Sequence, residues 1–364
     1  MRTNTLVKVA FIGCGRISKK HHEAIMELAE HGVRLTAVAD LETGKCKPYS
    51  NETAIKVTED FTAEGFLDGS DLAVILTESG NHFEHAKSAL ESGLDVLIEK
   101  PVTLKLEDAE ELRSIARQFD RKVYVVKQNR FNEPIVTARK FVESGFLGKP
   151  QISSVQVRWC RPQEYYDLAD WRGTWAMDGG VISNQASHHV DLMRWFMGPV
   201  KAVQALERRF GVDIETEDTV LAIVEFESGA VGTLEATTST RPRNLEGSFS
   251  MQGSMGAFEV GGFAVNEMRY LESSANDFTS TEFTTNNKLA KDTSDVYGSG
   301  HAAIYREIVK DRLGHENSAV TIDDAIETLK VIHMLYRSIE TGNKISGDAD
   351  DIRSFRMGRN DATE

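Results

Sequence analysis

Short apolar runs alternate with longer amphipathic segments over the first third of the chain. The apolar runs cover residues 7–12, 35–39, 72–76, 96–98 and 123–126, and helical periodicity runs up to residue 29 and over 83–92 and 106–117. Strands that are apolar on both faces and separated by helices are typical of a parallel sheet covered by helices on both sides. We therefore predict a doubly wound α/β domain over residues 1–125.

The pattern changes beyond residue 150. Alternating or β-branched segments cover residues 153–158, 200–210, 220–226, 230–237, 247–252 and 257–260, with turn residues at 227–229 and 253–256. Hairpins of this kind predict an open, mostly antiparallel sheet. Helical periodicity over 134–144, 301–312 and 323–340 adds helices that pack on the body. We therefore predict an α+β domain over residues 126–364.

Composition narrows the class of protein. The chain has 364 residues, 40% hydrophobic and 27% charged, which fits two soluble domains. No run approaches the roughly 20 apolar residues of a membrane span, and the start lacks a signal-peptide pattern, so we expect a cytoplasmic protein. A net charge of -14 disfavours nucleic acid, so an anionic ligand needs a local basic site. Three scattered cysteines predict neither disulfides nor a zinc site.

A glycine fingerprint follows the first strand. Residues 13–18 read Gly-Cys-Gly-Arg-Ile-Ser, a G-x-G-x-x-G/A pattern in which Ser18 takes the third small position. Gly13 allows a tight turn, and Gly15 lets a pyrophosphate approach the backbone at the start of a helix. Asp40 ends the second strand, where a carboxylate accepts the ribose hydroxyls and repels a 2′-phosphate. The segment predicts NAD binding in preference to NADP.

Glu99, Lys100 and Pro101 follow the strand over residues 96–98. Open α/β sheets bind ligands at the carboxyl ends of their strands. Burial lowers the pKa of an amine and a neighbouring carboxylate opposes that shift, so Lys100 can relay a proton there. An ion pair between Glu99 and Lys100 at the end of the strand explains the same residues without catalysis.

The segment 171–191 is dense in functional side chains. If residues 181–191 form one helix, Asn184, His188 and Asp191 share a face at i, i+4 and i+7. His188 can take the proton of a sugar hydroxyl, although a buried structural histidine also fits. We expect His189 to be structural. No metal site is predicted, because adjacent histidines diverge on a helix.

Together these motifs resemble the Gfo/Idh/MocA family of sugar and cyclitol dehydrogenases over nearly the whole chain. The resemblance implies a Rossmann domain that binds NAD and a second domain for substrate binding and oligomerisation. It makes Lys100, in Glu-Lys-Pro, and His188 the acid/base pair. Asn184 stands where most of the family has Asp, which implies that it orients the substrate, and Thr77-Glu78 departs from the family's Thr-Pro.

Asn184, the segments 127–132 and 240–247 and the Trp-Arg-Gly-Thr-Trp run over 171–175 resemble one branch more closely. That branch oxidises the C3 hydroxyl of UDP-N-acetylglucosaminuronate in bacterial surface-polysaccharide (O-antigen) pathways. Resemblance to this branch implies a homotetramer in which the open sheets of the second domains meet. It also implies that NADH stays bound and is reoxidised by 2-oxoglutarate as electron acceptor. Three alternatives stay open: a dehydrogenase of a free sugar, inositol or UDP-N-acetylglucosamine, an NAD-recycling glycoside hydrolase, and a non-catalytic dinucleotide sensor.

The resemblance and the motifs together give the predicted site. The predicted cofactor contacts are Gly13, Gly15, Arg16, Ile17, Asp40, Thr77, His82, Glu99, Lys100 and Gln128. The predicted substrate contacts are Lys100, Asn129, Arg158, Arg172, Asn184, His188 and Arg241. A UDP-linked uronate carries three negative groups, and guanidinium groups suit phosphate and carboxylate. The candidates for them are Arg130, Arg158, Arg161, Arg172, Arg241 and Arg243, with Arg172 preferred.

Overall fold

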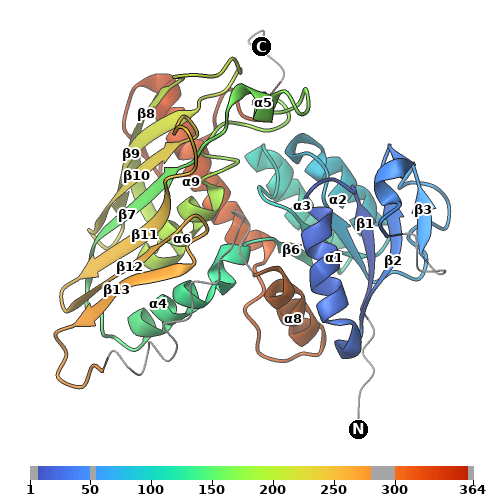
Figure 1. The fold of residues 1–364 in the computed structure, drawn as a ribbon, viewed down its shortest axis with the longest axis horizontal. Coiled ribbons are helices and arrows are strands. Elements are labelled where there is room, and N and C mark those ends of the chain that lie inside the picture. The colour runs from blue at the N-terminus through green and yellow to red at the C-terminus, as the bar shows by residue number, and fades with distance from the viewer. Residues whose placement is uncertain (1–6, 50–54, 280–299, 360–364) are drawn as a thin grey trace. The chain divides into compact units, whose positions relative to one another are not determined.

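Two units make up the chain in the computed structural model, which describes residues 7–49, 55–279 and 300–359 (Figure 1). The first unit comprises residues 1–126 with 301–327, and the second comprises residues 127–300 with 328–364. Among the helices within the described ranges, none combines the length and apolarity that crossing a bilayer requires.

The five apolar runs of the first unit lie in one parallel sheet, as predicted, and a short strand that we did not predict, β3, adds a sixth. The strand order is β3-β2-β1-β4-β5-β6, which is that of a Rossmann domain. Their bounds are β1 Val7–Ile12, β2 Val33–Ala39, β3 Lys56–Thr58, β4 Leu72–Ile75, β5 Asp95–Ile98 and β6 Val123–Val125. The helices between them are α1 Ser18–Glu27, α2 His82–Glu91 and α3 Leu106–Gln118. Every residue of β4 and β5 is buried, because helices cover both faces.

Residues 301–327 belong with the first unit, although we predicted a second domain that takes in everything from residue 126. The helix α8 (His301–Arg312) packs against α1, and the Val125 N–H donates to the Val320 carbonyl at 2.9 Å. The Tyr124 hydroxyl also donates to Asp311 at 2.5 Å. Residues 301–327, which follow most of the second unit in sequence, therefore pack at the β6 edge of the first unit's sheet.

The second unit is built on an open sheet of eight strands, in the order β13-β12-β11-β7-β10-β9-β8-β14. All neighbours are antiparallel except β7 and β10, which run parallel. The bounds are β7 Pro150–Arg158, β8 Val200–Arg208, β9 Thr219–Phe226, β10 Val231–Thr237, β11 Glu246–Gly253, β12 Gly256–Gly261, β13 Glu267–Ser273 and β14 Ile345–Ser346. The helices are α4 Glu133–Glu143, α5 Gln163–Tyr166, α6 Ser187–Met197 and α9 Ile322–Thr341, of which the last begins in the first unit.

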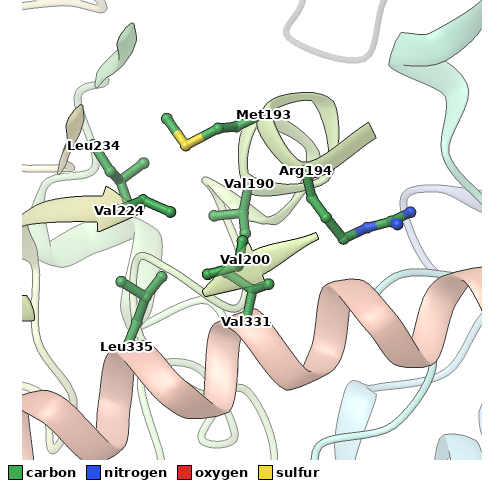
Figure 2. Close-up of a pocket in the computed structure, with 8 residues that line it drawn as sticks. All are labelled: Val190, Met193, Arg194, Val200, Val224, Leu234, Val331 and Leu335. Atoms are coloured by element: carbon green, nitrogen blue, oxygen red, sulfur yellow. The ribbon is translucent and has the colours of Figure 1, made fainter. Parts of the chain in front are cut away.

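Helix α6 lies against the sheet, and its apolar side chains meet those of α9 and the strands around a small apolar pocket (Figure 2). Val190 and Met193 come from α6, Leu234 comes from β10, and Val331 and Leu335 come from α9. This packing fixes α6 on the sheet, and α6 carries His188 near its start.

Candidate active site

The loop after β1 has the geometry of a dinucleotide cradle. Gly13 has a φ of +99°, and a Cβ at this position would lie 2.8 Å from the backbone carbon of Leu76, so only glycine fits. A Cβ at Gly15 would meet nothing within 4 Å, which leaves its backbone open to a ligand. Asp40 accepts the Cys14 N–H at 2.8 Å and the Glu42 N–H at 2.9 Å. Its carboxylate therefore stands beside the loop with acceptor capacity left for hydroxyl groups.

The start of α1 completes this cradle. The Ser18 hydroxyl donates to the Gly15 carbonyl at 2.5 Å, and Arg16 is exposed between them. Ile17 is the residue that caps the helix, and no side chain caps the free N–H groups of its first turn. Uncapped N–H groups at a helix start suit the phosphates of NAD. The residues present therefore fit the cofactor that the sequence predicts.

Glu99 lies in a buried polar cluster that sequence analysis missed. Its Oε1 accepts His21 Nε2–H at 2.9 Å, and the Tyr305 hydroxyl donates to His21 Nδ1 at 2.8 Å. His301 Nε2 lies 3.8 Å from the same carboxylate oxygen. Burial alone would raise the pKa of Glu99, but the two histidines hold it well below its usual range. Glu99 is thus an ionised group, and its Oε2 accepts the Lys100 backbone N–H at 3.1 Å.

His82 braces two loops of the first unit. It is buried, with Nδ1 2.7 Å from the Pro101 carbonyl and Nε2 3.1 Å from the Thr77 carbonyl. Burial lowers the pKa of His82, so the neutral ring donates to one of these carbonyls at a time. Because both ring nitrogens face backbone oxygens, His82 holds the two loops together, and its contact with the cofactor stays a prediction. The Thr77 hydroxyl bonds to His85 Nδ1 at 2.9 Å.

Asn184 lies in a turn and not on the helix that we predicted for residues 181–191. The helix α6 begins at Ser187, and residues 181–186 form turns whose Asn184 N–H donates to the Gly180 carbonyl at 3.0 Å. The Asn184 side-chain amide donates to the carboxylate of Asp178, whose other oxygen accepts the Gly173 N–H at 2.8 Å. Asp178 thereby orients Asn184, and sequence analysis did not single it out.

His188 is buried near the start of α6 and contacts Gln128. Gln128 Nε2 donates to His188 Nε2 at 3.0 Å, an arrangement that leaves the ring proton on Nδ1. Gln128, predicted as a cofactor contact, thus orients the histidine in the second unit. Asn129 is also buried, and its Oδ1 has no partner among the described residues, as a substrate contact would require. Burial lowers the pKa of His189 to about 4, as expected of a structural histidine.

Arg130 is used inside the unit and is not available as a site for anions. Its Nε and Nη2 each donate to Asp191 at 2.7 Å, and the Thr328 hydroxyl adds a bond of 2.8 Å. Lys127 Nζ lies 3.7 Å from the same carboxylate. Burial would raise the pKa of Asp191, but Arg130 and Lys127 hold it far below its usual range. Asp191 is therefore a permanent charge that ties α6 to residues 127–130.

Arg158 is likewise engaged, because Nε and Nη2 each donate to Glu235 on the neighbouring strand at 2.6 Å. The pair balances its charge, so Arg158 is a weaker candidate for a substrate anion than an arginine with neutral partners.

Arg161, Arg172 and Arg241 have neutral partners instead. Arg161 bonds to the Cys160 carbonyl at 2.8 Å, Arg172 to the Tyr165 hydroxyl at 2.7 Å, and Arg241 to the Thr238 carbonyl at 3.0 Å. Arg172 also stacks on Trp171 and Tyr165, and its buried Nε has no partner within the described ranges. These three guanidinium groups keep their charge for an anionic ligand.

Comparison with known proteins agrees with both units. The model of the oxidoreductase family with an NAD-binding Rossmann fold matches residues 7–127, and the GFO/IDH/MocA C-terminal domain matches residues 135–259. The crystal structure of the WlbA dehydrogenase from Bordetella pertussis in complex with NADH and UDP-GlcNAcA is 32% identical, with a TM-score of 0.87 over 94% of this chain and 97% of that one. The chain belongs to the Gfo/Idh/MocA family.

The similar proteins differ in the substrates that their names give. The WlbA dehydrogenase from Chromobacterium violaceum, also in complex with NADH and UDP-GlcNAcA, is 32% identical with a TM-score of 0.86, over 94% of this chain and 96% of that one. The scyllo-inositol 2-dehydrogenase (NAD(+)) of Bacillus subtilis is 24% identical over 280 residues, or 75% of this chain and 79% of its own. This member of the Gfo/Idh/MocA family is therefore an NAD-dependent dehydrogenase of sugars or polyols.

Proposed function

We propose that this enzyme oxidises the C3 hydroxyl of UDP-N-acetylglucosaminuronate (UDP-GlcNAcA) to a ketone in surface-polysaccharide biosynthesis. The observation that carries the proposal is the 32% identity, over 97% of its length, to a dehydrogenase crystallised with that sugar. The arginines without carboxylate partners support it, because a protein of net charge -14 must concentrate cations where it binds a substrate with three negative groups.

The chain's own residues take separate roles in this reaction. Bound NAD supplies the hydride acceptor. Lys100 and His188 manage the hydroxyl proton, and Gln128, which donates to His188 Nε2, orients the imidazole ring. Asn184 cannot exchange a proton, so it orients the sugar ring while Asp178 holds its amide. Arg172 binds the phosphate or carboxylate groups of the substrate.

The first test is substrate selection by the purified enzyme. UDP-GlcNAcA is mixed with the enzyme with and without added NAD, while NADH absorbance and 2-oxoglutarate consumption are followed. UDP-N-acetylglucosamine, which lacks the carboxylate, is the matched control, and scyllo-inositol represents the curated relatives. Oxidation of the uronate alone supports the proposal, and oxidation of inositol alone contradicts it.

Consumption of 2-oxoglutarate without added NAD would support the proposal that NADH stays bound to the enzyme between turnovers.

We also propose a homotetramer formed through the open face of the second unit's sheet.

A further inference from the structure

Two buried side chains of the second unit, Glu217 and Tyr336, hold the backbone of residues 180–183. The Tyr336 hydroxyl accepts the N–H groups of residues 180 and 183 at 3.2 and 3.4 Å, and donates to Glu217 Oε1 at 3.0 Å. The same Oε1 accepts the N–H of residue 182 at 3.2 Å, and the Glu217 backbone carbonyl accepts that of residue 181 at 3.2 Å. Four consecutive amides therefore depend on two residues, and the one donor and two acceptor sites of the Tyr336 hydroxyl are all used.

Glu217 is placed as a neutral acid. It is 2% exposed, and its Oε2 has no hydrogen-bond partner within the described residues. A Cβ at Gly180 would lie 1.6 Å from this oxygen, so the carboxyl group packs directly on a glycine backbone. An ionised carboxylate with one bare oxygen away from water is far more costly than a carboxylic acid.

The charges around Glu217 favour the same state. Burial raises the pKa of Glu217 to about 8, and the nearby carboxylate of Glu207 adds to that rise. Arg356 is the cation on this side, and it is paired with Glu207 at 3.0 and 3.2 Å. Tyr336 faces Glu217 from α9, and burial raises the pKa of its hydroxyl well above the usual value. At neutral pH both partners therefore carry no charge.

Residues 180–183 lie between Asp178 and Asn184, whose side-chain amide we propose contacts the substrate. Asp178 precedes it, and the Ser183 hydroxyl donates to the Asp178 carbonyl at 3.1 Å. Asn184 follows it, with its N–H on the Gly180 carbonyl at 3.0 Å and its side chain on the Asp178 carboxylate. A shift of the backbone at 180–183 must therefore move Asn184 relative to Asp178.

We propose that Glu217 and Tyr336 are positioning residues, a buried acid–phenol pair that holds Asn184 ready for the sugar. The inference rests on the proposed function only in taking Asn184 as a substrate contact. It adds two buried residues, distant in sequence, to those that shape the site.

The kinetic test separates positioning from general stability. Tyr336→Phe removes the acceptor of two backbone amides, and we expect the KM for the sugar to rise about tenfold with the Kd for NAD unchanged. Glu217→Gln keeps a neutral acceptor of the same shape, so its KM should match the wild type at pH 7. Tyr270→Phe, on an exposed tyrosine of β13, is the matched control.

A second measurement does not depend on the substrate. Hydrogen exchange of the amides of residues 180–183 should lose protection in Tyr336→Phe and keep it in Glu217→Gln. Infrared spectra at pH 7 should show the band of a protonated carboxylic acid that Glu217→Gln abolishes. If neither UDP-GlcNAcA nor inositol reacts, the proposed function fails while these spectra still test the anchor.

Two results would overturn the anchor: unchanged protection in Tyr336→Phe, or the absence of the acid band in the wild type.

Discussion

Lys100 is the residue whose proposed role can be separated most cleanly from cofactor binding. Its backbone N–H is held by the ionised Glu99 at the end of β5, and we propose that its ammonium group carries the proton. Lys100→Met keeps the length of the side chain and removes the proton. We expect kcat to fall by at least about 100-fold while NAD still binds, as measured by turnover and by titration with the cofactor.

The matched control is Lys87→Met on α2, whose lysine pairs with Glu111 at 3.1 Å on the surface. Turnover by Lys100→Met at the rate of this control would refute the role of Lys100.

Asp40 decides between NAD and NADP in our interpretation. Asp40→Asn removes the negative charge beside the nucleotide loop and keeps an oxygen for one of the two backbone N–H groups, which Asp40 accepts on separate oxygens. The Kd for NAD should rise by about tenfold, and the preference for NAD over NADP should weaken, because a charge-assisted bond and a repulsion are both lost. Calorimetric titration with both cofactors measures this.

Asp60→Asn is the control, since Asp60 also accepts a backbone N–H, that of Thr62 at 2.8 Å, in an exposed turn. Equal effects of the two substitutions would show that Asp40 acts on the fold alone.

Arg172 tests the basic site for the substrate. Its guanidinium stacks on Trp171 and Tyr165 and lacks a carboxylate partner within the described chain, whereas Arg158 is neutralised by Glu235. Arg172→Met should raise the KM for UDP-GlcNAcA by about tenfold or more, and Arg158→Met should change it little. Initial rates at varied sugar concentration decide, and a larger effect from Arg158→Met would contradict this assignment.

At the scale of elements, α6 is held by the buried pair of Arg130 and Asp191. Arg130→Met would remove both guanidinium hydrogen bonds from buried Asp191, with Lys127 Nζ still 3.7 Å away, and should lower the free energy of unfolding by about 3–5 kcal/mol, measured in urea. The folded-state pKa of Asp191 lies below its unfolded value, so its contribution is present above that unfolded value and is lost as the pH falls through the folded one. Removal of Arg130 should therefore move acid unfolding to higher pH.

Arg353→Met is the control on the surface, because Arg353 pairs with Asp351 in an exposed position. This substitution should lower the free energy of unfolding by less than about 1 kcal/mol. A cost for Arg130→Met in that range would show that the pair does not hold α6.

The sequence predicted the elements whose pattern reflects their burial. The strand β4 is a continuous apolar run, β1 and β5 are apolar apart from Lys8 and Asp95, and the fold class followed from these strands. Strand β13 was missed because only one of its seven residues is buried. The start of α6 was predicted too early, because the turn before it is set by Glu217 and Tyr336, which are distant in sequence.

The sequence also could not predict which side chains pair with one another across the fold. Arg158 faces Glu235 only because β7 and β10 pair in one register. Glu217 lies in an acidic run, Glu-Thr-Glu-Asp, that resembles a solvated surface, yet three of its four residues are buried. The candidate residues were therefore predictable by type, while their partners had to come from the structure.

At the scale of the whole molecule, one face of the second sheet exposes large apolar side chains. Leu206, Leu221 and Ile223 are 49%, 46% and 57% exposed, and Leu206 pairs with Leu221 across β8 and β9. On the neighbouring strands Val231 pairs with Ile152, and both are exposed as well. Contiguous apolar surface of this kind favours association with another protein surface.

We expect Ile223→Lys to dissociate the proposed tetramer into smaller species, because each copy would have to remove a lysine from water at the interface at a cost of several kcal/mol. Light scattering after size-exclusion chromatography measures the mass. Val57→Lys on β3, where Val57 is 42% exposed in the first unit, is the matched control and should keep the wild-type mass. If the wild type is a monomer, or if Ile223→Lys remains a tetramer on dilution, the open face does not form the interface and its apolar residues require another explanation.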